Sequence, residues 1–114
     1  MEVKMHVGQE FKRQFKQLAK KYRSLRTDFE EWKKEILENP FIGDDLGGGV
    51  RKIRMAIESK GKGKSAGARI LTLNVKISDD GLKVVLLTIY DKSEISNVKD
   101  DFIRYLIEQE TPNL

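Results

Sequence analysis

The sequence predicts an α+β fold of the order β-α-α-β-β-β-α, with an N-terminal strand and two antiparallel helices packed on an antiparallel sheet. Apolar residues recur at helical spacing over residues 11–36 and again near the C-terminus, whereas the period changes to two from Val50. Because 114 residues suffice for one modest hydrophobic core, we expect a single domain spanning residues 1–114.

The first third of the chain is expected to form a strand and two helices. Val3, Met5 and Val7 alternate with polar neighbours, as in a strand with one buried face. Apolar stripes at spacings of three and four residues predict two amphipathic helices. The stripes comprise Phe11, Phe15, Leu18 and Tyr22, followed by Leu25, Phe29, Trp32 and Ile36.

Two local signals bound the second helix. Residues 27–30, TDFE, match a capping box in which Thr27 and Glu30 each accept a backbone N–H, so we expect the helix to begin near Thr27. Pro40 disfavours helical geometry at Asn39 and should end the helix there. The turn-rich residues 42–49, IGDDLGGG, are expected to be a flexible link.

The second half should contain three consecutive antiparallel strands and a helix. In the strand from Val50, Ile53 and Met55 should face one side, and Lys52 and Arg54 the other. Strands over residues 68–77 and 82–90 are joined by SDDG, in which Gly81 accepts the positive φ of a tight hairpin. The last helix should be capped by Ser96 and carry a stripe of Val98, Phe102 and Leu106.

Charge is sorted into blocks along the chain. The net charge is +4, yet residues 11–26 hold seven basic and no acidic residues, and residues 50–69 hold seven basic residues against Glu58 alone. Two such blocks in a short chain favour a polyanionic partner, because each phosphate neutralised by Lys or Arg releases counterions. For either block by itself, a solvated surface with no partner is the alternative.

Several functional classes are disfavoured. The absence of cysteine excludes disulfides, thiolate nucleophiles and zinc fingers, and the single histidine, His6, cannot form a histidine pair, so we expect it to be a structural or surface residue. The acidic residues lie mostly on predicted helices or turns, so we expect no metal and no other cofactor. Because the N-terminus lacks a secretory signal and no apolar run could span a membrane, we expect a cytoplasmic protein without a membrane partner.

Residues 60–70, KGKGKSAGARI, are expected to form a hairpin loop whose glycines let the backbone approach a ligand closely. We expect a basic site to gather around this loop. It would comprise Lys60, Lys62 and Lys64 from the loop, Lys52, Arg54 and Arg69 from the strands, and Tyr90 and Lys92 at the end of the last strand. Parity places Arg69 on the same face as Leu71 and Leu73, so either a bulge turns it or that face is partly open.

Such a site has the groups needed to cleave RNA. The 2′-hydroxyl would attack the adjacent phosphorus while cations hold the extra negative charge. Packed cations lower one another's tendency to hold protons, so one lysine could transfer a proton while Arg69 stays charged and grips the phosphate. Tyr90 could supply a hydroxyl or a stacking ring, although ordinary packing is the alternative for this residue.

Four stretches carry a resemblance to a known family: KKYRSLRTD, ENPFIGDDLGGGVRKIRMA, SKGKGKSAGARI and LLTIYDKSEIS. They resemble toxins of type II toxin–antitoxin modules in the RelE/ParE superfamily, closest to the HigB-like branch, and GKGKSAGAR is the most specific run. The resemblance implies a RelE-like fold and a ribosome-dependent endoribonuclease, an mRNA interferase that cuts mRNA without a metal. It also implies a cognate antitoxin, which we expect to be acidic.

The resemblance also suggests roles for single residues. Arg69 resembles the arginine that grips the scissile phosphate, Lys52 and Arg54 resemble basic strand residues of the RelE site, and Tyr90 and Lys92 lie where the last strand contributes to the cleft. The sequence departs from RelE after that strand, with Ser93 in place of an arginine and no equivalent of a downstream tyrosine.

On this interpretation the basic first helix has a second role. A ribosome-docked enzyme must hold ribosomal RNA as well as mRNA, and the candidate residues are Lys12, Lys16, Lys20 and Arg23. Two alternatives stay open: a ParE-type inhibitor of DNA gyrase, and a basic module that binds nucleic acid or an acidic partner without catalysis.

Overall fold

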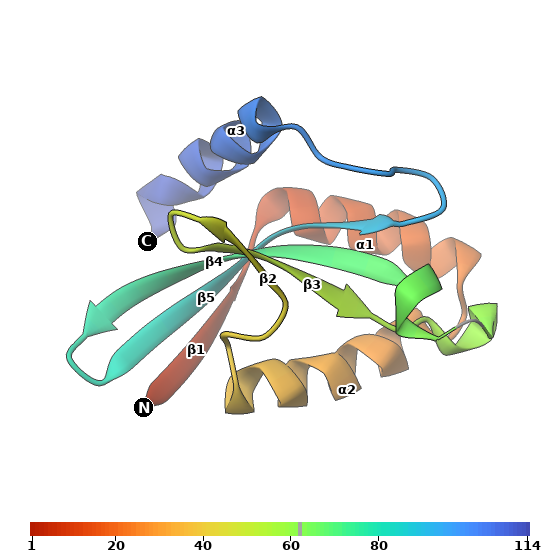
Figure 1. Cartoon of the computed structure of the whole chain (residues 1–114), viewed down its shortest axis with the longest axis horizontal. Helices are drawn as coiled ribbons and strands as arrows, with labels where there is room; N and C mark the ends of the chain where they lie inside the picture. The colour runs from red at the N-terminus through yellow and green to blue at the C-terminus, as the bar shows by residue number, and fades with distance from the viewer. Residues whose placement is uncertain (62) are drawn as a thin grey trace.

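A five-stranded mixed sheet forms the centre of the computed structural model, which describes residues 1–61 and 63–114. The strands are β1 (Glu2–Val7), β2 (Asp44–Gly47), β3 (Val50–Met55), β4 (Ala68–Ser78) and β5 (Gly81–Asp91). Their order across the sheet is β1-β5-β4-β3-β2 (Figure 1). The predicted α+β class and the antiparallel meander of β3, β4 and β5 are confirmed.

The sheet is not antiparallel throughout, because β1 pairs parallel with β5. Alternation within a strand predicts which face is buried and contains no information on which strand lies next to it. The pairing of Val7 with Leu86 joins residues far apart in the sequence, so it depends on the tertiary fold.

The expectation of a flexible link at residues 42–49 is wrong. Within it, β2 pairs antiparallel with β3, with Asp44 opposite Lys52. Gly43 and Gly49 adopt positive φ, and a Cβ at either position would lie under 3 Å from the backbone of a neighbouring strand. The glycines therefore allow a tight chain reversal against the sheet edge rather than flexibility.

Helices α1 (Gln9–Lys21) and α2 (Leu25–Glu38) cover one face of the sheet, which we call the α1–α2 face. Both predicted stripes point into the core beneath them, where Phe11, Leu18, Leu25, Trp32 and Ile36 are buried. The second helix ends before Asn39, as Pro40 predicts.

The predicted capping box is not formed. The helix α2 begins at Leu25, two residues earlier than Thr27, and its N-cap is Ser24. A turn in which the Leu25 N–H donates to the Tyr22 carbonyl connects the two helices, and the Ser24 hydroxyl donates to Asp28 Oδ2 at 2.7 Å. The short connection brings the helix start forward, so Thr27 lies within the first turn.

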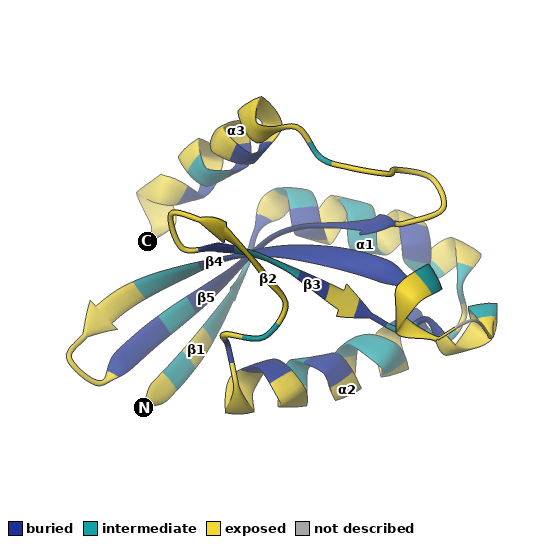
Figure 2. Cartoon of the chain, in the orientation of Figure 1, coloured by how far each residue is buried: buried dark blue, intermediate teal, exposed yellow. Residues whose placement is uncertain are grey.

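The opposite face, which we call the α3 face, is covered by α3 (Asp100–Glu110). Figure 1 shows α2 and α3 on opposite sides of the sheet, and Figure 2 shows buried residues concentrated on the central strands between them. The N-cap is Lys99, three residues later than the predicted Ser96. Of the predicted stripe, Leu106 is buried and Val98 packs against the core, whereas Phe102 is 39% exposed and Ile103 is buried in its place.

The β4–β5 hairpin forms where it was predicted, with a different geometry. Ser78 pairs with Gly81 across the two-residue turn of Asp79 and Asp80, and Gly81 does not adopt a positive φ. A Cβ on Gly81 would lie 2.6 Å from the Ser78 hydroxyl oxygen. A side chain at this position would have to displace the Ser78 hydroxyl, which can rotate away, and the positive φ on which the prediction depended is not observed.

Candidate active site

Two arginines and a tyrosine form one row across the meander. Arg54 on β3 pairs in register with Arg69 on β4, and Arg69 pairs with Tyr90 on β5. Directly opposed residues of antiparallel strands have Cβ atoms about 5 Å apart on one face. The row lies on the α3 face, because Leu71 and Tyr90 belong to the core packed under α3.

This row places two like charges side by side, an arrangement that ordinarily destabilises a sheet. Burial lowers the pKa of Arg69 below its ordinary value, and the neighbouring Arg54 lowers it further. Burial also raises the pKa of Tyr90, although Arg69 opposes that shift. The tyrosine therefore keeps its proton at neutral pH, and the two guanidinium groups form a positive spot that an anion would stabilise.

The loop above Arg69 explains how this arginine is accommodated on the same face of the sheet as Leu71. Arg69 stays on the face of Leu71 and is only 5% exposed. Its guanidinium donates to the carbonyl oxygens of Lys64 at 3.1 Å, Ser65 at 3.0 Å and Ala68 at 3.2 Å. A turn of the loop, rather than α3, covers the arginine at this end of the sheet.

Lys52 and Arg54 line a hollow at the edge of β3. Its lining includes Lys64, Glu35 and Asp44, and its volume is about 360 Å³. Arg54 is exposed, and neither Lys52 nor Arg54 forms an ion pair with any residue that the structure describes. The two cations are therefore free to bind a ligand that enters from the edge of the sheet.

The loop lysines do not surround one spot. Lys60 points toward the α1–α2 side, where its Nζ donates to Asp91 Oδ1 at 2.8 Å. Lys64 lies 3.8 Å from Glu35 of α2. Lys62 lies outside the described residues. Lys60 therefore does not join the expected basic site, because Asp91 binds it on the other side of the sheet, whereas Lys64 lies near Glu35 and also lines the hollow that contains Lys52 and Arg54.

A second hollow lies on the other side of the loop. It measures about 350 Å³ and is lined by Lys60, Ser65, Ala66, Lys92 and Ser93. Lys92 is exposed, and its backbone N–H donates to the Gly67 carbonyl, which fixes the end of β5 against the loop. The turn that binds Arg69 thus lies between the two hollows, with Lys52 and Arg54 in one and Lys92 in the other.

Asp91 is the residue that sequence reasoning missed. Its carboxylate is fully buried and accepts hydrogen bonds from Lys60, the Tyr22 hydroxyl and Ser93. Burial alone would raise the pKa of Asp91, but these hydrogen bonds outweigh it and hold the pKa well below its ordinary value. The only available signal was an acid directly following an apolar strand, which is common at strand ends.

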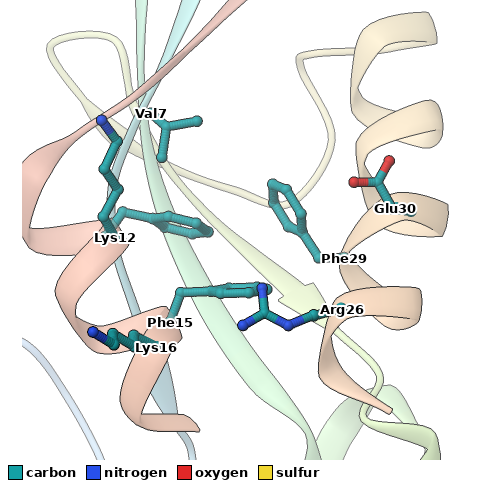
Figure 3. Close-up of a pocket in the computed structure, with 8 residues that line it drawn as sticks. Val7, Lys12, Phe15, Lys16, Arg26, Phe29 and Glu30 are labelled. Carbon is teal, nitrogen blue, oxygen red and sulfur yellow. The ribbon is translucent and has the colours of Figure 1, made fainter. Parts of the chain in front are cut away.

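The basic residues of α1 lie on a separate surface. Lys12, Lys16, Lys20 and Arg23 are all exposed. Between α1 and α2 is a groove of about 510 Å³, into which Phe15 and Phe29 point from the two helices (Figure 3). Lys12, Lys16 and Arg26 border it. This surface is thus a patch with an aromatic floor and a basic rim, separate from the Arg54–Arg69 row.

The remaining sequence predictions concern metals and histidine. No group of three His, Asp or Glu side chains suited to a metal ion occurs within residues 1–61 and 63–114. His6 is structural, as predicted, because its Nε2 lies 3.0 Å from Glu110 Oε1 of α3. Among the helices described, none has the length and apolar character needed to cross a membrane.

A family model agrees with this architecture. Residues 5–109 match the model described as the RelE toxin of the RelE / RelB toxin-antitoxin system. The chain belongs to the RelE toxin family. It is therefore a toxin of a toxin–antitoxin system, and the family implies a cognate antitoxin as its partner. Toxins of this family are generally endoribonucleases that cleave mRNA. The match is to RelE as a whole, so the HigB-like branch stays a prediction.

Proposed function

We propose that this RelE-family toxin is a ribosome-dependent endoribonuclease, and that its active site is the Arg54–Arg69–Tyr90 row with Lys52 and Lys92 beside it. The observation that carries the proposal is the in-register pairing of Arg54 with Arg69 on the partly open end of the α3 face. Two opposed cations cost stability unless an anion is bound between them, and a phosphodiester is such an anion.

In the proposed reaction the RNA supplies its own nucleophile. The 2′-oxygen bonds to the adjacent phosphorus and loses its proton to a basic group, while the bond to the 5′-oxygen breaks. The departing oxygen takes up a proton, and the products are a 2′,3′-cyclic phosphate end and a free 5′-hydroxyl end. Cations are effective here because they stabilise the charge that develops on phosphorus only in the transition state.

The residues fit different parts of this reaction. Arg54 is exposed and free of described ion pairs, so it suits direct contact with the phosphate. Arg69 contributes its charge from beneath the loop. Because the pKa of Tyr90 is raised, its hydroxyl holds a proton at neutral pH and fits a donor rather than a base. Lys52 and Lys92 are the candidates for the remaining proton transfer and for binding the flanking phosphates.

The basic α1 surface fits ribosomal RNA in this proposal. Lys12, Lys16 and Lys20 recur every four residues and so lie along one side of the helix. Their exposure lets them contact phosphates without disturbing the core. The translating ribosome would then hold the substrate mRNA, while α1 holds the toxin on the ribosome through contacts with ribosomal RNA.

The decisive experiment compares two exposed arginines. Brief induction of the wild type should stop growth and create new 5′ ends within translated mRNA, whereas Arg54→Ala should reduce cleavage roughly 10²-fold, the usual cost of removing one transition-state contact. Arg104→Ala is the matched control, because Arg104 lies on α3, its side chain is 74% exposed, and its one ion pair among the described residues is with Asp101 on the same helix.

Three outcomes would count against the proposal. Cleavage by Arg54→Ala at the wild-type rate would exclude the proposed site. Intact transcripts together with DNA damage signalling would instead indicate a gyrase inhibitor. Expression without an antitoxin that leaves growth unaffected would indicate a non-catalytic binding module.

A further inference from the structure

Asp91 connects three segments that are distant in the sequence. It is the last residue of β5, and its carboxylate accepts hydrogen bonds from Tyr22 between the two helices, from Lys60 in the loop and from Ser93 after the strand. The Lys60 contact is 2.8 Å, and Ser93 donates both its backbone N–H at 2.9 Å and its hydroxyl at 2.7 Å. A buried carboxylate is costly without such donors, so the four contacts depend on one another.

This buried carboxylate lies directly behind the candidate active site. Asp91 follows Tyr90 on β5, and it pairs across the sheet with Ala68, the residue before Arg69. Successive residues of a strand point to opposite faces. Tyr90 therefore belongs to the α3 face, whereas Asp91 accepts its hydrogen bonds on the α1–α2 side, which makes it unsuited to direct contact with RNA in the row.

The loop between β3 and β4 is attached at both ends by side-chain contacts. Near its start, the Glu58 N–H donates to Asp28 at 3.1 Å and the Ser59 N–H donates to the Ser24 hydroxyl at 2.9 Å. Near its end, the carbonyl oxygens of Lys64 and Ser65 accept from Arg69. The Lys60–Asp91 ion pair lies between these attachments, and the Lys60 side chain is only 12% exposed.

We propose that Asp91 is a positioning residue of this toxin, which holds the loop through Lys60 and thereby sets the place of the carbonyl oxygens that orient Arg69. The inference rests on the proposed function, because the orientation matters for catalysis only if the row is the active site. Removing the carboxylate releases Lys60, loosens the turn at Lys64 and Ser65, and lets the Arg69 guanidinium leave its place. A misplacement of about 1 Å costs on the order of 10²-fold in rate.

The chain offers a matched control for the loss of a buried acid. Glu110 is 3% exposed and accepts from His6 at 3.0 Å and from the Gln9 N–H at 3.0 Å. It attaches α3 to the start of α1 and forms no hydrogen bond or ion pair with the loop residues that the structure describes, 56–61 and 63–67. Asp91→Asn and Glu110→Gln both replace a buried carboxylate by an amide, so both should lower the melting temperature.

The test measures steady-state cleavage of ribosome-bound mRNA, with kcat and KM determined separately, at a temperature where both variants are folded. Asp91→Asn should lower kcat by about 10-fold to 10²-fold with little change in KM, and Glu110→Gln should leave both near the wild-type values. Equal losses in the two variants, or a wild-type kcat for folded Asp91→Asn, would overturn the proposal. If Asp91→Asn does not fold, Tyr22→Phe and Lys60→Met each remove one contact and should lower kcat in the same way; wild-type kcat in both would also overturn it.

A structural readout separates this proposal from the proposed function. Asp91→Asn should change the NMR signal of the Arg69 Nε–H group and speed amide exchange at residues 58–61 and 63–67, while Glu110→Gln should change neither. If the wild type cuts no RNA, the proposed function fails on its own, and the NMR result still decides whether Asp91 positions Arg69. An unchanged Arg69 signal in folded Asp91→Asn would overturn the positioning role.

Discussion

The two faces of the sheet are built for different purposes. On the α1–α2 face, apolar side chains from both helices, β3, β4 and β5 form a continuous buried core. On the α3 face, the core under α3 extends to Leu71 and Tyr90 and then gives way to Arg69 and the exposed Arg54. The comparison indicates that one face supplies most of the stability, while the end of the other face holds the two opposed arginines that we propose bind the phosphate.

The largest expected effect on stability comes from a substitution in the core of the α1–α2 face. Ile36 of α2 is fully buried in the α1–α2 core, so Ile36→Ala should lower the free energy of unfolding by about 2–5 kcal/mol through lost burial and a cavity. Urea denaturation measures this loss. Cleavage per folded molecule should stay near the wild-type value, and a cost under about 1 kcal/mol would contradict the division between the faces.

Arg54→Ala tests the α3 face, where removing a side chain should leave stability unchanged or increase it. Because Arg54 lies opposite Arg69 and has no described ion-pair partner, its removal should relieve repulsion and leave the free energy of unfolding unchanged or raised by up to about 1 kcal/mol. The same denaturation assay applies, with Arg104→Ala as the reference. A destabilisation comparable to that of Ile36→Ala would mean that Arg54 is a structural residue.

Asp91 should make the stability of the protein depend on pH. Its pKa is held below the ordinary value in the folded protein, so the unfolded chain binds a proton more readily. This contribution is present above about pH 4, the ordinary Asp pKa, and is lost as the pH falls from there toward the folded-state pKa, by about 1.4 kcal/mol per unit of pKa difference. Denaturation midpoints measured from pH 7 down to pH 3 should therefore fall less steeply in Asp91→Asn than in the wild type, and identical slopes would contradict the assignment.

The smallest effect on stability is expected at the α1 surface. Reversing the charges of Lys16, Lys20 and Arg23 to Glu should change the free energy of unfolding by only about 0.5 kcal/mol per residue, since all three side chains are exposed. Ribosome association in a sedimentation assay should weaken, and its salt dependence should become shallower. Unchanged association would remove α1 from the proposed ribosome contact.

Much of the fold could be predicted from local patterns. The stripes of α1 and α2, the end of α2 before Pro40 and the alternation in β3 were all predicted correctly, because each depends on residues within a few positions of one another. The same alternation placed Arg54 and Arg69 on strands of one meander. The starts of α2 and α3 were misplaced, because the predictions relied on capping side chains and neither observed N-cap, Ser24 or Lys99, makes a side-chain cap hydrogen bond.

The sequence by itself determined the α+β class, the apolar faces and the two basic blocks, because periodicity and composition are local properties of the chain. Only the tertiary structure decided that β2 joins the sheet, that β1 runs parallel to β5, and that Lys60 turns away from Arg69 toward Asp91. These outcomes depend on contacts between distant segments, where a buried carboxylate must find donors wherever the fold places them. The residues around a lysine in a glycine-rich loop do not predict which acidic residue it will pair with in the folded protein.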